Sequence, residues 1–105
     1  MILRMLILVS EKEDKNMKIK LTEFWNSKNT LYIHCNTRQK ATTLLNAFNK
    51  LGKTWSGGCS YLKRDNYDDE ESKTCYSNKG MYCGYEECKD RNHIIYEFED
   101  VDLAN

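Results

Sequence analysis

Three cysteines and one histidine in the last third of the chain have the side chains that bind zinc. They are Cys75, Cys83, Cys88 and His93. A zinc site needs four such ligands in a tetrahedron, usually with pairs two to four residues apart. Seven, four and four residues separate these four in turn, so the short spacer of a tight zinc knuckle is not present. Packing and metal binding both stay open as explanations, and we expect neither a metal nor a cofactor.

A second candidate site lies in the middle of the chain, where aromatic and basic residues precede an acidic run. Its members are Trp55, Tyr61, Lys63, Arg64, Tyr67, Asp68, Asp69, Glu70 and Glu71. Aromatic and basic side chains together bind single-stranded nucleic acid by stacking and phosphate contact, and they also form hot spots of protein interfaces. The adjacent carboxylates would repel a phosphate backbone. We therefore predict that these nine residues contact a protein partner rather than nucleic acid.

Catalytic groups do not fall into a pattern that supports a reaction. A cysteine nucleophile needs a histidine oriented by a third group. His34 precedes Cys35, but neighbours on a strand point to opposite faces. Residues 52–54 (GKT) follow a predicted helix instead of opening one, and Ala47 stands where a phosphate-binding loop has its first glycine. We predict that the protein is not an enzyme.

The elements that position these residues centre on residues 30–60. Alternating residues predict a strand at 30–35, and the spacing then changes to that of a helix. Asn36 or Thr37 can cap the start of this helix, and Gly52 can end it in the left-handed conformation. The apolar residues at helical spacing are Ala41, Leu44, Leu45, Phe48 and Leu51.

Short strands are expected around this unit. Residues 18–25 alternate and would form a hairpin with the strand at 30–35. Further strands are predicted at 53–56, 73–77, 81–85 and 93–98, with one helical turn within 86–92 and a tight turn at 78–80. The predicted fold is one small α+β domain, a mostly antiparallel sheet of five or six short strands with one long helix packed on one face.

Charge and cysteine content limit the class of protein further. Residues 1–64 carry 12 Lys/Arg and 4 Asp/Glu, a balance of +8, and residues 65–105 carry 4 and 12, a balance of −8. Such an asymmetry can mark a bipolar surface that docks a charged partner, but the favoured interpretation is that the two halves interleave in the fold and neutralise one another. The five cysteines are an odd number without a CxxC pair, so we expect free thiols in a reducing cytosol, mostly buried.

Residues 1–16 are expected to be a leader, with the domain at residues 17–105. Residues 1–9 are apolar but too few to span a bilayer. Codons for residues 12–14 (KED) can contain a bacterial ribosome-binding sequence, and Met17 follows at a suitable distance. We therefore expect Met17 to be the native start.

Several segments of residues 17–105 resemble small phage and prophage proteins of low-GC Gram-positive bacteria. The similar segments are residues 50–58 (KLGKTWSGG), residues 74–76 (TCY) and residues 94–101 (IIYEFEDV). Their motifs are structural, so no catalytic residue can be transferred. The resemblance implies a bacteriophage accessory protein that acts in the host cell cytoplasm, and anti-CRISPR inhibitors of host defence are one kind of such protein.

The expected function is stoichiometric inhibition of a host defence protein, such as a CRISPR effector nuclease. This would be a host–virus interaction through protein binding, with no membrane involved. The alternative is a binding module that sequesters a nucleotide signal or single-stranded nucleic acid. That module would use Trp55, Tyr61, Lys63 and Arg64.

Overall fold

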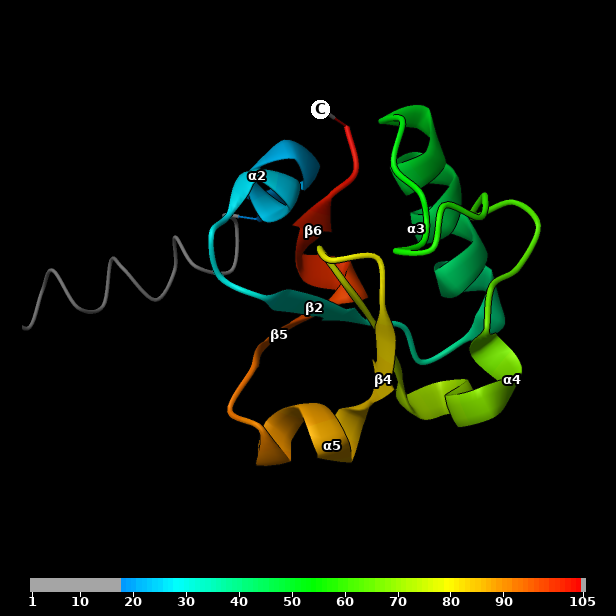
Figure 1. The fold of residues 1–105 in the computed structure, drawn as a ribbon. Coiled ribbons are helices and arrows are strands. Elements are labelled where there is room, and N and C mark those ends of the chain that lie inside the picture. The colour runs from blue at the N-terminus through cyan, green and yellow to red at the C-terminus, as the bar shows by residue number, and fades with distance from the viewer. Residues whose placement is uncertain (1–17, 105) are drawn as a thin grey trace, which may run out of the picture.

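The computed structural model describes residues 18–104 of the chain (Figure 1). The predicted leader at residues 1–16 and the predicted start at Met17 lie outside the described residues. The elements are β1 (Ile19–Lys20), α2 (Leu21–Asn26), β2 (Leu31–His34), α3 (Arg38–Lys50), α4 (Tyr67–Glu70), the 3-10 helix η1 (Glu71–Lys73), β3 (Thr74–Ser77), β4 (Tyr82–Gly84), α5 (Tyr85–Asp90), β5 (Ile94–Glu97), the 3-10 helix η2 (Phe98–Asp100) and β6 (Val101–Asp102).

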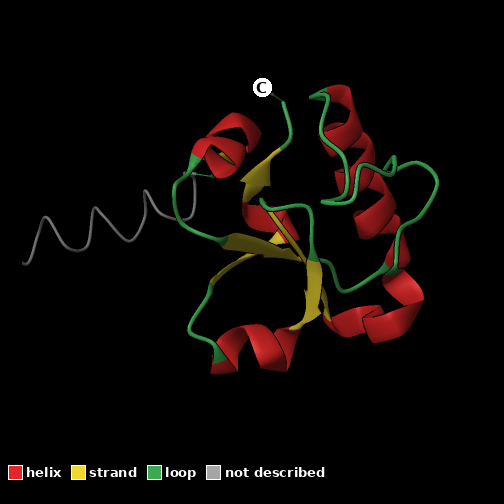
Figure 2. Ribbon diagram, viewed as in Figure 1, coloured by secondary structure: helices red, strands yellow, loops and turns green. Residues whose placement is uncertain are grey.

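Six strands within residues 18–104 form two sheets (Figure 2). The main sheet has the order β4-β3-β2-β5, in which β3 pairs antiparallel with β4 and β2, whereas β5 pairs parallel with β2. Strands β1 and β6 form a separate parallel pair. The predicted α+β domain is confirmed. The prediction of one mostly antiparallel sheet is wrong, because late strands of the chain return parallel to early ones.

The described residues form four α-helices, so the prediction of one long helix is also wrong. Helix α3, with 13 residues, begins and ends as its sequence indicates. Thr37 Oγ1 accepts a hydrogen bond from the Lys40 N–H, and Gly52 adopts a φ of +80° just after the helix. No helix within residues 18–104 has the length and apolar character to cross a membrane.

The predicted strand at residues 18–25 is mostly helical. Only two residues pair as β1, and α2 follows directly, so no hairpin forms with β2. Glu23 Oε1 accepts the Lys20 N–H at 3.0 Å, an N-terminal capping contact. Leu21 and Phe24 lie three residues apart on the buried face of α2. Strand alternation would place these two residues on opposite faces, whereas helical spacing places both on one face.

The predicted strand at residues 53–56 is a loop. The Trp55 N–H donates to the Cys59 carbonyl at 3.0 Å, and the Ser56 N–H donates to the Gly80 carbonyl at 2.9 Å. These bonds fold the loop onto the β3–β4 turn. Trp55 still packs in the main core.

The main sheet carries a hydrophobic core on each face. In β2, Ile33 faces the larger core with α2 and α3, and its neighbour Tyr32 faces a smaller second core. Figure 1 shows α5 on the opposite side of the sheet from α2 and α3. Helices therefore cover both faces, which corrects the prediction of a helix on one face only. The buried residues of the second core are Tyr32, Cys75, Cys83 and Cys88.

A buried amide joins the β3–β4 turn to the rest of the domain. Asn78 is 5% exposed. Its Nδ2 donates to the carbonyls of Phe24 and Asn29, both at 2.9 Å, and its Oδ1 accepts the Leu31 N–H at 3.1 Å. The tight turn predicted at 78–80 is present, with Gly80 at a φ of +74°. The first residue of that turn is thus also an internal link between α2, β2 and β3.

Candidate functional site

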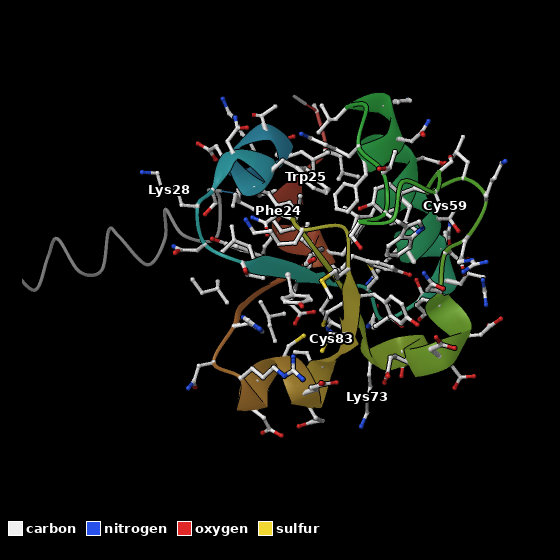
Figure 3. The ribbon with its side chains drawn as sticks, viewed as in Figure 1. Phe24, Trp25, Lys28, Cys59, Lys73 and Cys83 are labelled. Atoms are coloured by element: carbon white, nitrogen blue, oxygen red, sulfur yellow. The ribbon has the colours of Figure 1, made fainter. Side chains whose placement is uncertain are left out.

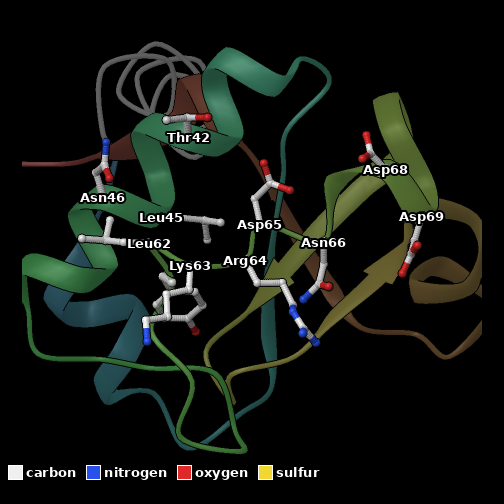
Figure 4. Close-up of a pocket in the computed structure, with 11 residues that line it drawn as sticks. Thr42, Leu45, Asn46, Leu62, Lys63, Arg64, Asp65, Asn66, Asp68 and Asp69 are labelled. Carbon is white, nitrogen blue, oxygen red and sulfur yellow. The ribbon is translucent and has the colours of Figure 1, made fainter.

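An open groove of about 480 Å³ lies between α3 and the loop at residues 61–66, and it reaches the start of α4. Figure 4 shows Thr42, Leu45 and Asn46 of α3 on one side, and the loop on the other. Leu45 and Tyr61 are buried beneath it. Five of the nine predicted partner-binding residues line the groove, namely Tyr61, Lys63, Arg64, Asp68 and Asp69.

Two core aromatic side chains hold the loop of the groove by its backbone. Trp55 Nε1–H donates to the Arg64 carbonyl at 2.8 Å, and the Tyr76 hydroxyl donates to the Asp65 carbonyl at 2.7 Å. Burial raises the pKa of Tyr76 well above its ordinary value, so the hydroxyl keeps its proton. The backbone is fixed from below, while the side chains of Lys63 and Arg64 are exposed.

The three aromatic residues predicted to contact a partner are core residues, which corrects that part of the prediction. Trp55, Tyr61 and Tyr67 are 7%, 3% and 6% exposed. The Trp55 and Tyr61 rings pack on each other, with centroids 4.7 Å apart. A base cannot stack on rings that the core already covers. These residues mainly position the site, and of the three only Tyr61 also lines the groove.

Arg38, in the first turn of α3, fixes the start of α4. Its guanidinium forms ion pairs with both Asp65 and Asp68, and it lies over the Tyr67 ring at 5.2 Å. Asp65 Oδ1 also accepts the Tyr67 N–H at 3.0 Å. Sequence reasoning missed Arg38, because it lies 27 residues from Asp65 and belongs to no local motif.

Four exposed carboxylates follow on α4 and the first residue of η1. This acidic surface consists of Asp68, Asp69, Glu70 and Glu71. Asp69 accepts a hydrogen bond from the Tyr82 hydroxyl, which raises the pKa of Tyr82. The Glu70 side chain packs against Gly84. A Cβ atom added to Gly84 would lie 2.6 Å from Glu70 Oε1. Two of the four side chains thus lie against β4 and its end, and Asp69 is hydrogen-bonded there.

Glu71 carries backbone strain at the junction of α4 and η1. Its φ of 52° and ψ of −124° form a combination that glycine adopts far more readily than other residues. We expect Glu71→Gly to raise the free energy of unfolding by about 1 kcal/mol, because the relief of strain exceeds the added freedom of the unfolded chain. Urea unfolding measures this change. Glu71→Ala keeps the strain and should give no such gain, and equal effects of both variants would contradict the assignment.

The two oppositely charged halves of the sequence interleave in part. Arg38 pairs with Asp65 and Asp68, and Lys40 pairs with Glu99. The hydrogen bond from Lys40 is the main cause that holds the pKa of Glu99 below its usual range. Neutralisation is therefore concentrated at the first turn of α3. The other exposed members of the predicted site form no ion pair within residues 18–104, and these are Lys63, Arg64, Asp69, Glu70 and Glu71.

Three of the four candidate zinc ligands meet in the second core. Cys75, Cys83 and Cys88 pack together there, and the His93 ring lies 5.1 Å from that of Tyr32. Among residues 18–104, however, no group of three or more His, Cys, Asp or Glu side chains is arranged to hold a metal ion. Burial raises the pKa of Cys75 to about 12, so its thiol keeps the proton that a metal would displace. The prediction of mostly buried free thiols is confirmed for every cysteine except the exposed Cys59.

The groove and the acidic surface together offer charged and hydrogen-bonding contacts to a partner. Neither His34 nor His93 lines the groove. His34 instead bonds to the Glu97 carboxylate and the Ser72 carbonyl, both at 2.8 Å.

Comparison with known protein families, with curated protein sequences and with solved structures found no match to this chain.

Proposed function

We propose that the protein is a phage accessory protein that binds a host defence protein and blocks it stoichiometrically, without catalysis. A CRISPR effector nuclease in the host cytoplasm is the partner class that we propose. The observation that supports this most is the exposed acidic surface of α4 and η1 beside an open groove. Closely spaced carboxylates present the kind of charge that a nucleic-acid channel attracts, so they could occupy such a channel in place of phosphates.

The acidic surface is also held in place before any partner binds. The Thr74 hydroxyl donates to the Glu71 carbonyl at 2.7 Å, which ties η1 to β3. Arg38 and Tyr82 hold Asp68 and Asp69 from two other elements. Side chains that are already ordered lose less freedom on binding. This favours a surface that acts as a fixed array of charges.

Lys63 and Arg64 add positive charge to the proposed interface, next to the negative charge of the carboxylates. Both are exposed and lie on the wall of the groove, next to the carboxylates. Charges at the rim of an interface act mainly on orientation and on the rate of association. We propose that these two side chains orient the partner. Direct nucleic-acid binding is not proposed, because the stacking rings are buried and carboxylates adjoin the basic pair.

Reversal of charge on the acidic surface tests the proposal. The assay is DNA cleavage by a purified CRISPR effector nuclease, chosen by pull-down of the full chain from Gram-positive cells that carry a CRISPR system. We expect the unmodified protein to stop cleavage at equimolar ratio. We expect Asp68→Lys, Asp69→Lys, Glu70→Lys and Glu71→Lys together to weaken inhibition at least about 100-fold, since like charges then face each other across the interface.

A smaller matched pair separates local from net charge. Glu70→Lys with Glu71→Lys changes the net charge as much as Glu86→Lys with Asp90→Lys on α5. Only the first pair should weaken inhibition, and thermal unfolding should show that both variants fold. Undiminished inhibition by the four-fold reversal would overturn the phosphate-mimic proposal. A nucleotide that co-purifies with the protein, with no captured defence protein, would support the sequestering alternative instead.

A further inference from the structure

Two cysteines flank the start of helix α5. Gly84 is the N-cap residue, so Cys83 comes just before the cap and Cys88 is the fourth residue of the helix. A residue just before the cap commonly packs against the fourth helical residue, an arrangement known as the hydrophobic staple. In this chain both staple positions carry a thiol. Figure 3 shows Cys83 on the part of β4 that meets α5.

The thiols of the second core interact with one another. Burial raises the pKa of Cys88 most, and hydrogen bonding with Cys83 and with Cys75 raises it further. Cys75 lies directly opposite Cys83 on the neighbouring strand β3. Cys75, Cys83 and Cys88 pack in one buried cluster with Tyr32. Their exposures are 0%, 9% and 0%.

We propose that Cys83 and Cys88 form an intramolecular disulfide when a peroxide oxidises the protein. The Cys83 thiol loses its proton to solvent, and the thiolate attacks one oxygen of hydrogen peroxide. The O–O bond breaks, and the leaving hydroxide takes up a proton from solvent, so that a sulfenic acid and one water form. The Cys88 sulfur then attacks the Cys83 sulfur, the S–O bond breaks, and a second water leaves. Two thiols lose two electrons, and one peroxide is reduced to two waters.

Exposure and strand register select this pair over the other two. Cys83 is the only one of the three that solvent reaches, so it reacts first. The Ser77 N–H donates to the Met81 carbonyl at 2.9 Å, and the alternation of the ladder makes Cys75 and Cys83 a hydrogen-bonded pair. Side chains of such pairs lie farther apart than those of the alternating pairs. Cys88 is thus the better partner for Cys83.

The reaction depends on pH through the thiolate. Burial raises the pKa of Cys83 above its ordinary value, so the thiol is protonated at neutral pH. The thiolate is the nucleophile. At pH values below the pKa, each increase of one pH unit raises the thiolate fraction about tenfold. We expect disulfide formation to be slow at neutral pH and faster at about pH 9. The disulfide would join the end of β4 to α5, and it requires no partner protein, so it stands apart from the proposed function.

Tryptic peptides separate the possible products. Residues 80–89 form one peptide that contains both Cys83 and Cys88, whereas Cys75 lies in the peptide of residues 74–79. The full chain is treated with hydrogen peroxide, unfolded, alkylated and digested. We expect the peptide of residues 80–89 without alkylation and lighter by two hydrogen atoms. A cross-link between the two peptides would overturn the proposed pairing.

Controls within the chain complete the test. Exposed Cys59 reports that the peroxide acted, and its oxidation with both cysteines of peptide 80–89 still alkylated would overturn the proposal. The Cys75→Ala variant should still form the disulfide between Cys83 and Cys88. Failure of this variant to form it would contradict the proposed pairing. Cys88→Ala should leave a sulfenic acid on Cys83 that dimedone traps, and no trapping would overturn the order of attack. The measurement on the unmodified chain stands even if a variant fails to fold.

Discussion

Replacing Asn78 with alanine is expected to lower the free energy of unfolding by about 3 kcal/mol or more. The side chain is buried and bonds to three backbone groups, the carbonyls of Phe24 and Asn29 and the N–H of Leu31. Alanine leaves all three groups without that partner in a site that water barely reaches. Each buried polar group left unsatisfied costs about 1–3 kcal/mol.

Urea unfolding of two variants and a control checks this expectation. Asn78→Asp keeps an acceptor for the Leu31 N–H but turns an oxygen toward two carbonyls, so it should be no more stable than Asn78→Ala. Asn46 is exposed on α3, and Asn46→Ala should change the free energy of unfolding by no more than about 0.5 kcal/mol. A loss at Asn78 as small as that at Asn46 would contradict its role as an internal link.

Gly80→Ala should be destabilising to a similar degree, at about 3 kcal/mol. The residue has a φ of +74°, which side chains other than glycine rarely accept. An added Cβ would also lie 2.5 Å from the Ser56 nitrogen and 3.0 Å from the Thr54 carbonyl oxygen. Both contacts are with backbone of the loop that follows α3, so no side-chain rotation can relieve them.

Two other glycines separate the causes of this loss. Gly52 has a φ of +80° but open space around it, so Gly52→Ala should cost only the backbone part, about 1–2 kcal/mol. Gly57 has neither feature, and Gly57→Ala should have little effect. Thermal or urea unfolding should rank the losses as Gly80, then Gly52, then Gly57. If Gly80→Ala and Gly52→Ala lower the free energy of unfolding equally, the loop that contains Thr54 and Ser56 moves away from residue 80 at little cost.

Features with local causes could be predicted from the sequence. Helix α3 combines apolar residues at helical spacing, a capping threonine at 37 and a glycine at 52, and all three signals lie within about five turns of helix. The turn at residues 78–80 and the short helix α5 likewise depend on neighbouring residues. Such signals act over a few positions, so no knowledge of the rest of the chain is needed.

Features that depend on distant parts of the chain could not be predicted. β1 pairs with β6, and β2 pairs parallel with β5, so these contacts join segments from opposite ends of the described chain. The residues at 18–26 contain no signal for pairing with a strand near residue 101. Their sequence therefore could not predict that β1 would be only two residues long. The antiparallel hairpin was the natural expectation, because neighbouring strands most often pair.

The candidate site divides in the same way. The exposure of Lys63, Arg64 and the four carboxylates follows from their charge alone. The burial of Trp55 does not, since an aromatic residue among basic ones can face either the partner or the core. Its role as an anchor depends on the Arg64 carbonyl nine residues away, and that of Arg38 depends on Asp65 and Asp68, which are distant in the sequence.

The parallel pairing of β5 with β2 and of β6 with β1 also determines when the domain can be completed during synthesis. A ribosome releases the chain from its N-terminus, so β2 emerges long before residues 94–102. Until then β2 has one side of its backbone unpaired, and such an edge is a template for wrong pairing. The domain can therefore close only after residues 94–102 have been synthesised, and a chain cut short before β5 would expose its central strand to aggregation.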